Sequence, residues 1–213
     1  MSETPAPANR PRVICVDLDG TLLRTDTLVE MLVAALRFPR NWALLLRQLL
    51  AGRAALKREA AALAPLDPAT LPYEESLLRY LSEERASGSR IVLATAADRA
   101  IAERINLHLG LFHEVIASDG ANNVKGEAKG EALVKAFGEG GFIYVGNGRP
   151  DLAVWHRAGG GVVVNASPSI ERRARQATAV ELTIQSRPPW WRSLLRAMRP
   201  YQWRRMPSCS FRW

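Results

Sequence analysis

The chain is poor in the residues that build disulfide-bonded, zinc-binding and membrane-spanning proteins. Its 213 residues include two cysteines and three histidines. Cys15 lies in an apolar run and Cys209 near the C-terminus, a spacing that indicates neither a disulfide framework nor a metal site. No run of 18 apolar residues occurs, and residues 1–11 lack the apolar stretch of a signal peptide. We therefore expect a cytoplasmic protein with a flexible N-terminal lead.

Acidic residues are missing from the C-terminal segment, residues 187–213. This segment holds seven arginines and four of the six tryptophans, whereas residues 1–186 have 22 basic and 21 acidic residues. The net charge of +8 therefore describes the tail and not the body, which argues against a nucleic-acid groove across the fold. The tail is either a disordered remnant or an interfacial membrane anchor, because tryptophan and arginine suit the lipid headgroup region.

Short β-branched runs alternate with helical stretches along residues 12–186, which we take as one domain. The runs are RVICVD (12–17), RIVLAT (90–95), EVIAS (114–118), FIYVG (142–146) and GVVVN (161–165). Continuous apolar strands between helices indicate a parallel sheet covered on both faces, an α/β fold of three layers. Ligands bind beyond the carboxyl ends of such strands. The polar residues that follow each run are therefore the candidates for a functional site.

The first two predicted strands are more than seventy residues apart, and helical spacing of apolar residues fills most of that stretch. We expect an inserted helical cap over residues 25–72, followed by a helix over 73–88 that returns to the sheet. The basic residues of the cap lie among leucines. They either form the solvated face of amphipathic helices or recognise an anionic, lipid-linked substrate: Arg37, Arg40, Arg47, Arg53, Lys57 and Arg58.

Two carboxylates directly follow the first predicted strand. The sequence VICVDLDGTL places Asp17 and Asp19 at the strand end, where Gly20 permits a sharp turn and Thr21 can cap it. Carboxylates two residues apart can divide the work of catalysis, since one can attack while the other moves a proton. The alternative is an acidic corner between strand and turn without chemistry.

Other polar residues mark the ends of the second and fourth predicted strands. Thr95 stands where its hydroxyl and the following N–H groups can bind a phosphoryl oxygen, or where it only caps a helix. Lys125 and Lys129 precede the fourth strand, which ends in VGNGRPD. Asn147 occupies that strand end, and the only acid of the loop, Asp151, comes four residues later.

In this order the motifs resemble those of the haloacid dehalogenase (HAD) superfamily, over about residues 12–167. The resemblance implies a Rossmann-like sheet and a nucleophile, Asp17, that forms an aspartyl-phosphate. It implies that Asp19 is the general acid and then the base, and that Thr95 binds the transferring phosphoryl group. Lys129 would neutralise the charge at Asp17. We prefer it to Lys125 because KGEAL begins the helix directly before the strand, as the family's lysine does.

The same resemblance implies a Mg²⁺ cofactor, because a phosphate monoester must approach an anionic nucleophile. HAD phosphatases commonly carry GDxxxD at the fourth strand, where this chain has GNxxxD. Asn147 then offers a neutral amide oxygen, and Asp151 approaches the ion directly or through a water. The alternative is a decayed site kept for folding. The implied metal ligands are Asp17, Asp19, Asp151 and Asn147.

Longer phrases resemble the HAD domain found ahead of UbiA-type polyprenyl transferase domains in bacterial fusion proteins. Among them are LPYEESLLRYLSEERASGSRIVLATAADR and VVVNASP, and that subfamily often has VGN followed by an acid four residues on. The segment LLRAMRPYQW (194–203) is similar to the start of the transferase domain. We therefore expect a truncated or detached form of such a fusion, with residues 187–213 as a remnant of the membrane domain.

The resemblance implies a Mg²⁺-dependent phosphomonoester hydrolase that acts on a polyprenyl-linked phosphosugar. The alternative is a catalytically weak phosphate-binding or scaffolding domain of a prenyltransferase. Expected partners are a small phosphorylated or lipid-linked substrate, a prenyltransferase and, through the tail, the inner face of the membrane. No nucleic-acid partner is expected.

Overall fold

Six parallel strands form one sheet in the computed structural model, which describes residues 11–36, 38–52, 59, 63, 66–118 and 126–186. The order β3-β2-β1-β4-β5-β6 puts β1 near the centre, between β2 and β4. This confirms the predicted α/β fold. The strands are β1 (Val13–Val16), β2 (Arg90–Asp98), β3 (Glu114–Ser118), β4 (Ile143–Gly146), β5 (Gly160–Val164) and β6 (Val180–Ile184).

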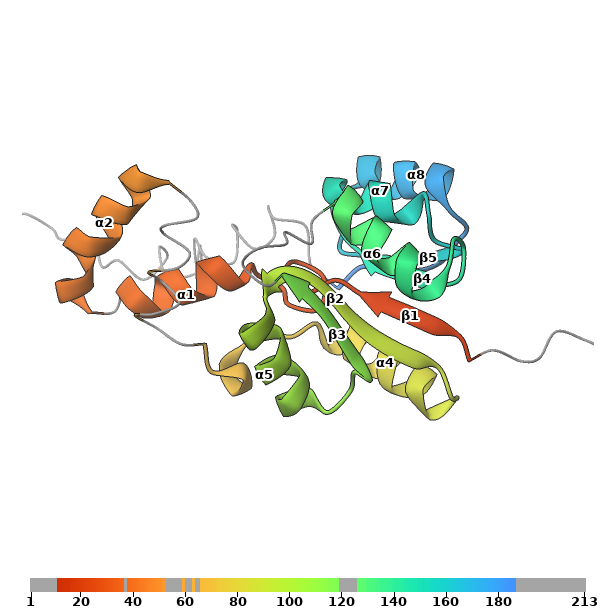
Figure 1. Cartoon of the computed structure of the whole chain (residues 1–213), viewed down its shortest axis with the longest axis horizontal. Coiled ribbons are helices and arrows are strands. Elements are labelled where there is room, and N and C mark those ends of the chain that lie inside the picture. The colour runs from red at the N-terminus through yellow and green to blue at the C-terminus, as the bar shows by residue number, and fades with distance from the viewer. Residues whose placement is uncertain are drawn as a thin grey trace, which may run out of the picture.

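Helices cover both faces of the sheet. Figure 1 shows α4 and α5 on one face and α6, α7 and α8 on the other, which gives the three expected layers. The α-helices are α1 (Thr27–Leu36), α2 (Trp42–Ala51), α4 (Glu75–Ala86), α5 (Arg99–Leu109), α6 (Glu127–Phe137), α7 (Leu152–Trp155) and α8 (Pro168–Ala177). The part of the chain that the structure describes also contains three 3₁₀ helices, η1 (Pro39–Asn41), η2 (Pro68–Thr70) and η3 (Arg149–Asp151).

The inner strands β1, β4 and β5 are apolar because both of their faces are buried. Ile14 and Val16 of β1 belong to a core cluster with Leu77 of α4, whereas Cys15 between them belongs to a second cluster with Trp155 of α7. Side chains of a strand alternate between the two faces, so consecutive apolar residues supply both cores. The continuous apolar runs in the sequence reflect this burial.

The sequence did not predict β6, the strand at one edge of the sheet. Its residues are mostly half-buried and include Glu181, so they form no continuous apolar run. The five predicted strands are present with shifts at their ends, the largest being β2, which continues to Asp98. The helix predicted over residues 73–88 is α4, Glu75–Ala86.

The segment between β1 and α4 leaves and re-enters the sheet through two paired stretches. Arg24 N donates to Pro72 O (2.9 Å), and Glu74 N donates to Leu22 O (2.9 Å). Helices α1 and α2 extend from this stem to one side of the layers (Figure 1). They belong to the segment predicted to be a cap. That this segment forms a unit of its own remains a prediction. Across the described residues, no helix is both long and apolar enough to cross a bilayer.

Several predictions fall outside the described residues. They concern the N-terminal lead, the tail over residues 187–213 with Cys209, the cap residues Arg37, Arg53, Lys57 and Arg58, and Lys125.

Candidate active site

Asp17 lies at the carboxyl end of β1, at the centre of the sheet. Its backbone N donates to Val145 O (3.0 Å), which continues the β1–β4 ladder by one residue. The residue is 9% exposed. Because the flanking strands β2 and β4 are parallel to β1, their carboxyl ends reach the same edge of the sheet, and the residues after them surround Asp17.

Lys129 reaches Asp17 from the first turn of α6. Its Nζ donates to Asp17 Oδ1 at 2.5 Å, and the lysine is 4% exposed. A buried lysine is rare unless it is paired, and this pairing is short and charge-assisted. The structure therefore places Lys129, the lysine that the sequence analysis preferred, beside Asp17.

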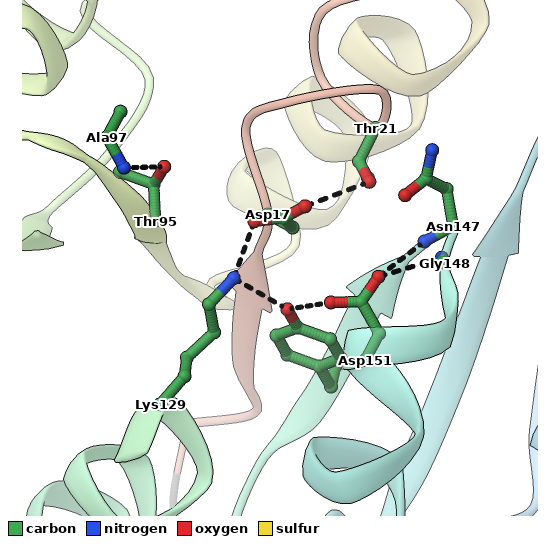
Figure 2. A network of polar contacts seen from close by, with 9 residues as sticks. Asp17, Thr21, Thr95, Ala97, Lys129, Asn147, Gly148 and Asp151 are labelled. Carbon is green, nitrogen blue, oxygen red and sulfur yellow. Dashed lines mark hydrogen bonds and ion pairs between the residues drawn. The ribbon is translucent and has the colours of Figure 1, made fainter. Parts of the chain in front are cut away.

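Tyr144, on β4, extends this contact into a chain of buried polar groups. Its hydroxyl accepts a hydrogen bond from Lys129 Nζ (3.0 Å) and donates one to Asp151 Oδ1 (2.8 Å). Figure 2 shows the continuous path from Asp17 through Lys129 to Asp151. The carboxylate of Asp17 thus contacts the lysine directly, and that of Asp151 is linked to it through the tyrosine hydroxyl.

Asp151 also fixes the loop that follows β4. Its Oδ2 accepts from the backbone N of Asn147 (3.0 Å) and of Gly148 (2.9 Å). A Cβ at Gly146 would lie 2.8 Å from Asp151 Cγ, so only glycine allows the carboxylate to pack over the strand end. With Tyr144, Asp151 therefore accepts three hydrogen bonds from the chain, out of about four directions that a carboxylate offers.

The side chain of Asn147 lies against the turn after β1. Gly20 has a φ of +77°, and a Cβ there would come within 2.4 Å of Asn147 Nδ2. Glycine is thus required at this turn for its left-handed backbone, and a Cβ would in addition displace the amide of Asn147. Asn147 and the DxDGT turn form one side of the site (Figure 2).

Asp19 connects the site with the first helix of the inserted segment. Its Oδ1 accepts from the backbone N of Thr27, the first residue of α1, at 2.7 Å. The turn itself is closed by Gly20 N, which donates to Thr25 O (3.0 Å). Thr21 is buried, and its hydroxyl lies 3.4 Å from Asp17 Oδ2. Asp19 is therefore held by the start of the helical segment.

Thr95 is fully buried at the level of the site but does not cap a helix. Its Oγ1 accepts from Ala97 N (2.9 Å), and β2 continues to Asp98 with a shift in its pairing with β3. The cap of α5 is Asp98, whose side chain accepts from Ala100 N (2.9 Å). The helix-capping alternative for Thr95 is thus wrong, and its hydroxyl orders the irregular strand end beside Asp17 (Figure 2).

Burial dominates the electrostatics of the site. It raises the pKa of Asp17 to about 7; the charge of Lys129 opposes this rise, and the charges of Asp151 and Asp19 add to it. Burial, with the negative charges of Asp151 and Asp17, also raises the pKa of Tyr144 well above its usual value. The Tyr144 hydroxyl therefore stays protonated and remains a donor.

Comparison with known proteins supplies the family. The model of the haloacid dehalogenase-like hydrolases matches residues 14–156. The chain belongs to this family. It is also 38% identical over 173 residues to the uncharacterized protein y4nM of Sinorhizobium fredii, a match that covers 78% of the chain and 32% of y4nM. The chain thus spans about a third of the length of that curated relative.

Solved HAD structures share the fold. The HAD family hydrolase t0658 of Salmonella enterica serovar Typhi has a TM-score of 0.60 and 16% identity, over 85% of this chain and 69% of that one. The apo form of phosphoserine phosphatase has a TM-score of 0.59 and 18% identity, over 88% of this chain and 98% of that one. A phospho-aspartyl intermediate analogue of phosphoserine phosphatase has a TM-score of 0.56 and 18% identity, over 88% of this chain and 99% of that one.

The donor set of this HAD site fits a hard cation that keeps most of its waters. Asp17 and Asp19 contribute carboxylates from one turn, and the amide of Asn147 lies against the same turn. Mg²⁺ prefers oxygen ligands and commonly binds through one or two protein carboxylates. Within the described residues, no group of three or more His, Cys, Asp and Glu side chains is placed to hold a metal ion by itself. The oxygen donors at this turn suit Mg²⁺ better than a metal that prefers nitrogen or sulfur ligands.

Sequence reasoning missed Tyr144 and Gly146. Tyr144 was read only as one apolar residue of a strand, although a buried tyrosine normally needs a partner for its hydroxyl. That rule, applied to a tyrosine three residues before Asn147, could have placed it in the site. Gly146 belongs to the GNxxxD pattern, but the pattern does not reveal its role, which depends on where Asp151 packs.

Proposed function

We propose that this HAD-family hydrolase is a phosphatase in which Asp17 is the nucleophile. The observation that carries the proposal is the buried ion pair of Asp17 and Lys129 at the carboxyl end of the central strand. A carboxylate that is buried with a cation beside it is arranged to react and not to be solvated. The shared fold of phosphoserine phosphatase and its phospho-aspartyl analogue supports the same chemistry.

In the first step a carboxylate oxygen of Asp17 attacks the phosphorus of a phosphate monoester. The bond between phosphorus and the alcohol oxygen breaks, and Asp19 gives its proton to that oxygen. The alcohol leaves, and the phosphoryl group remains on Asp17 as an acyl phosphate. Lys129 offsets the charge that gathers on the phosphoryl oxygens, and Tyr144 holds the lysine in place.

In the second step a water molecule attacks the same phosphorus. Asp19, now ionised, takes a proton from the water, and the bond between phosphorus and the Asp17 oxygen breaks. Inorganic phosphate leaves, and Asp17 is again a carboxylate. Thr95 would bind a phosphoryl oxygen during both steps. A bound Mg²⁺, held by Asp17, Asp19, Asn147 and Asp151, would supply further positive charge at the phosphoryl group.

For the substrate we propose a phosphorylated sugar linked to a polyprenyl chain, at the inner face of the cytoplasmic membrane. The support is the resemblance of the chain to HAD domains fused with UbiA-type transferases, including the GNxxxD loop that contains Asn147. The relative y4nM has room for a further domain, since this chain matches 32% of its length. A prenyltransferase, fused or separate, is the proposed partner.

A second function, phosphate binding or scaffolding with weak catalysis, is favoured by the loop after β4. Asn147 is neutral where HAD phosphatases commonly have an acid, and the chain itself uses three acceptor directions of Asp151. Both features would weaken the hold on Mg²⁺. In this account Asp151 orders the loop, and Asn147 marks a loss of metal affinity.

Hydrolysis of p-nitrophenyl phosphate with and without Mg²⁺ distinguishes the two. We expect activity in the wild type that Asp17→Asn lowers on the order of a thousandfold or more, because the amide cannot form the acyl phosphate. An inactive wild type together with an active Asn147→Asp variant would favour the binding function. Thermal unfolding of each variant controls for loss of structure.

A further inference from the structure

Helices α1 and α2 and the corner between them expose an unusual number of large apolar side chains. Eight such residues, between 48% and 84% exposed, lie within this short stretch; we call them the α1–α2 apolar surface: Val29, Val33, Leu36, Phe38, Trp42, Leu46, Leu49 and Leu50. Single exposed apolar residues are common, but a concentration of this kind marks an interaction surface.

On α1 the exposed apolar residues fall on one side of the helix. Val29, Val33 and Leu36 are spaced by four and three residues, which places them along one stripe. Met31 and Ala35, on another side, are fully buried. The helix is therefore apolar both where it packs on the protein and where it faces solvent.

The same holds for α2. Trp42, Leu46 and Leu49 are again spaced by four and three residues, and Leu50, the most exposed of the eight, lies next to them. Leu45 is buried, in a small cluster with Ala35 of α1. Each helix thus carries a second apolar stripe that its own packing does not use.

The corner between the helices joins the two stripes. Asn41 Nδ2 donates to Ala35 O (2.9 Å), and Trp42 Nε1 donates to Leu36 O (2.9 Å). Trp42 therefore lies at the end of the α1 stripe while it begins the α2 stripe. The guanidinium of Arg40 stacks over the ring of Phe38 at 5.1 Å from its centroid, so a cation is built into the same corner.

The charge around this surface has one sign. From residue 31 to residue 58 the sequence contains six basic residues and no acidic residue. Two of the six, Arg40 and Arg47, are described, and both are exposed. A second copy of the chain would bring a like-charged surface against this one, which argues against self-association through it. An apolar stripe with arginines and a tryptophan at its edge instead matches an anionic lipid interface.

We propose that the α1–α2 apolar surface docks on an anionic lipid bilayer. The leucines and valines enter the boundary between headgroups and acyl chains, the indole of Trp42 lies at headgroup level, and Arg40 and Arg47 contact anionic headgroups. This contact is separate from the tail and does not depend on chemistry at Asp17. It would hold the helical segment that begins beside Asp19 at the membrane surface.

Co-sedimentation of the full chain with lipid vesicles tests the proposal. The vesicles contain phosphatidylcholine alone, or equal parts of phosphatidylcholine and phosphatidylglycerol. We expect binding to the anionic vesicles, and a loss of affinity of at least about tenfold in the double variant Leu46→Gln, Leu50→Gln, because two apolar side chains no longer enter the lipid. The matched control is Leu107→Gln on α5, a leucine that is 86% exposed outside this surface, and it should bind as the wild type does.

Three results would overturn the proposal. The first is equal binding of wild type and double variant, which would assign any membrane contact to the tail. The second is that the wild type binds neutral and anionic vesicles equally, or that the variant Arg40→Gln with Arg47→Gln binds anionic vesicles as well as the wild type does. The third is a wild-type dimer in analytical ultracentrifugation that the double variant abolishes, which would make the surface an interface between copies. Thermal unfolding of each variant, measured in parallel, verifies that it is folded.

Discussion

Removal of one hydroxyl, that of Tyr144, tests whether the buried polar chain at the site is a structural unit. This hydroxyl is the shared partner of Lys129 Nζ (3.0 Å) and Asp151 Oδ1 (2.8 Å). The side chain is fully buried, so in Tyr144→Phe no bulk water replaces the lost partner. The phenylalanine ring keeps the packing, and only the two hydrogen bonds are lost.

The expected cost follows from the two bonds. Hydrogen bonds to charged groups contribute about 1.5–3 kcal/mol each, and a shared hydroxyl gives less than the sum of two independent bonds. We expect Tyr144→Phe to lower the free energy of unfolding by about 2–4 kcal/mol. At about 2–4 °C per kcal/mol for a chain of this size, Tm falls by roughly 5–15 °C.

The chain provides a matched control in Tyr73. Its hydroxyl is also buried but has no hydrogen-bond partner among the described residues. Tyr73→Phe removes an unsatisfied polar atom and should leave Tm unchanged or raise it slightly. Urea and thermal unfolding followed by circular dichroism compare both variants with the wild type. If Tyr144→Phe were as stable as Tyr73→Phe, the reasoning about the buried chain would be refuted.

Two further predictions concern the turn after β1 and the titration of Asp17. Gly20→Ala should lower the free energy of unfolding by more than Gly88→Ala does. Both variants have backbone strain of about 1–2 kcal/mol, but only at Gly20 must the new Cβ also displace the side chain of Asn147. Equal losses of unfolding free energy, measured by urea denaturation, would contradict this. Asp17, with a pKa of about 7, is mostly protonated at pH 6, and Mg²⁺ must then displace the proton. Isothermal titration calorimetry should therefore find about tenfold tighter Mg²⁺ binding at pH 8 than at pH 6. Affinity that falls or stays constant over this range would exclude Asp17 as a ligand with that pKa.

The position of Asp17 could be foreseen because it follows from the topology. In a parallel sheet, residues just after adjacent strands must converge, and a buried carboxylate among them needs a cation. The topology does not select that cation: Lys129 was preferred to Lys125 because of its resemblance to the lysine of the HAD family. The strands themselves were visible because burial on both faces makes them continuously apolar.

Other features depend on packing that no local pattern records. Tyr144 becomes a polar bridge only because α6 delivers Lys129 on one side of it and the loop after β4 delivers Asp151 on the other. The edge strand β6 is half-exposed, so it lacks the apolar run that revealed its neighbours. The helical periodicity of α1 and α2 was visible in the sequence, but only the fold shows that each helix keeps a second, exposed apolar stripe.

If Asp17 is the nucleophile it becomes phosphorylated during turnover, and the phosphoryl group can be trapped on it. The wild type is incubated with p-nitrophenyl phosphate and Mg²⁺, quenched in acid, digested and examined by mass spectrometry. We expect one added phosphoryl group on the peptide that contains Asp17, and none on the same peptide of Asp17→Asn. If Asp17→Asn hydrolysed the substrate as fast as the wild type, and the wild-type peptide carried no phosphoryl group, Asp17 would not be the nucleophile.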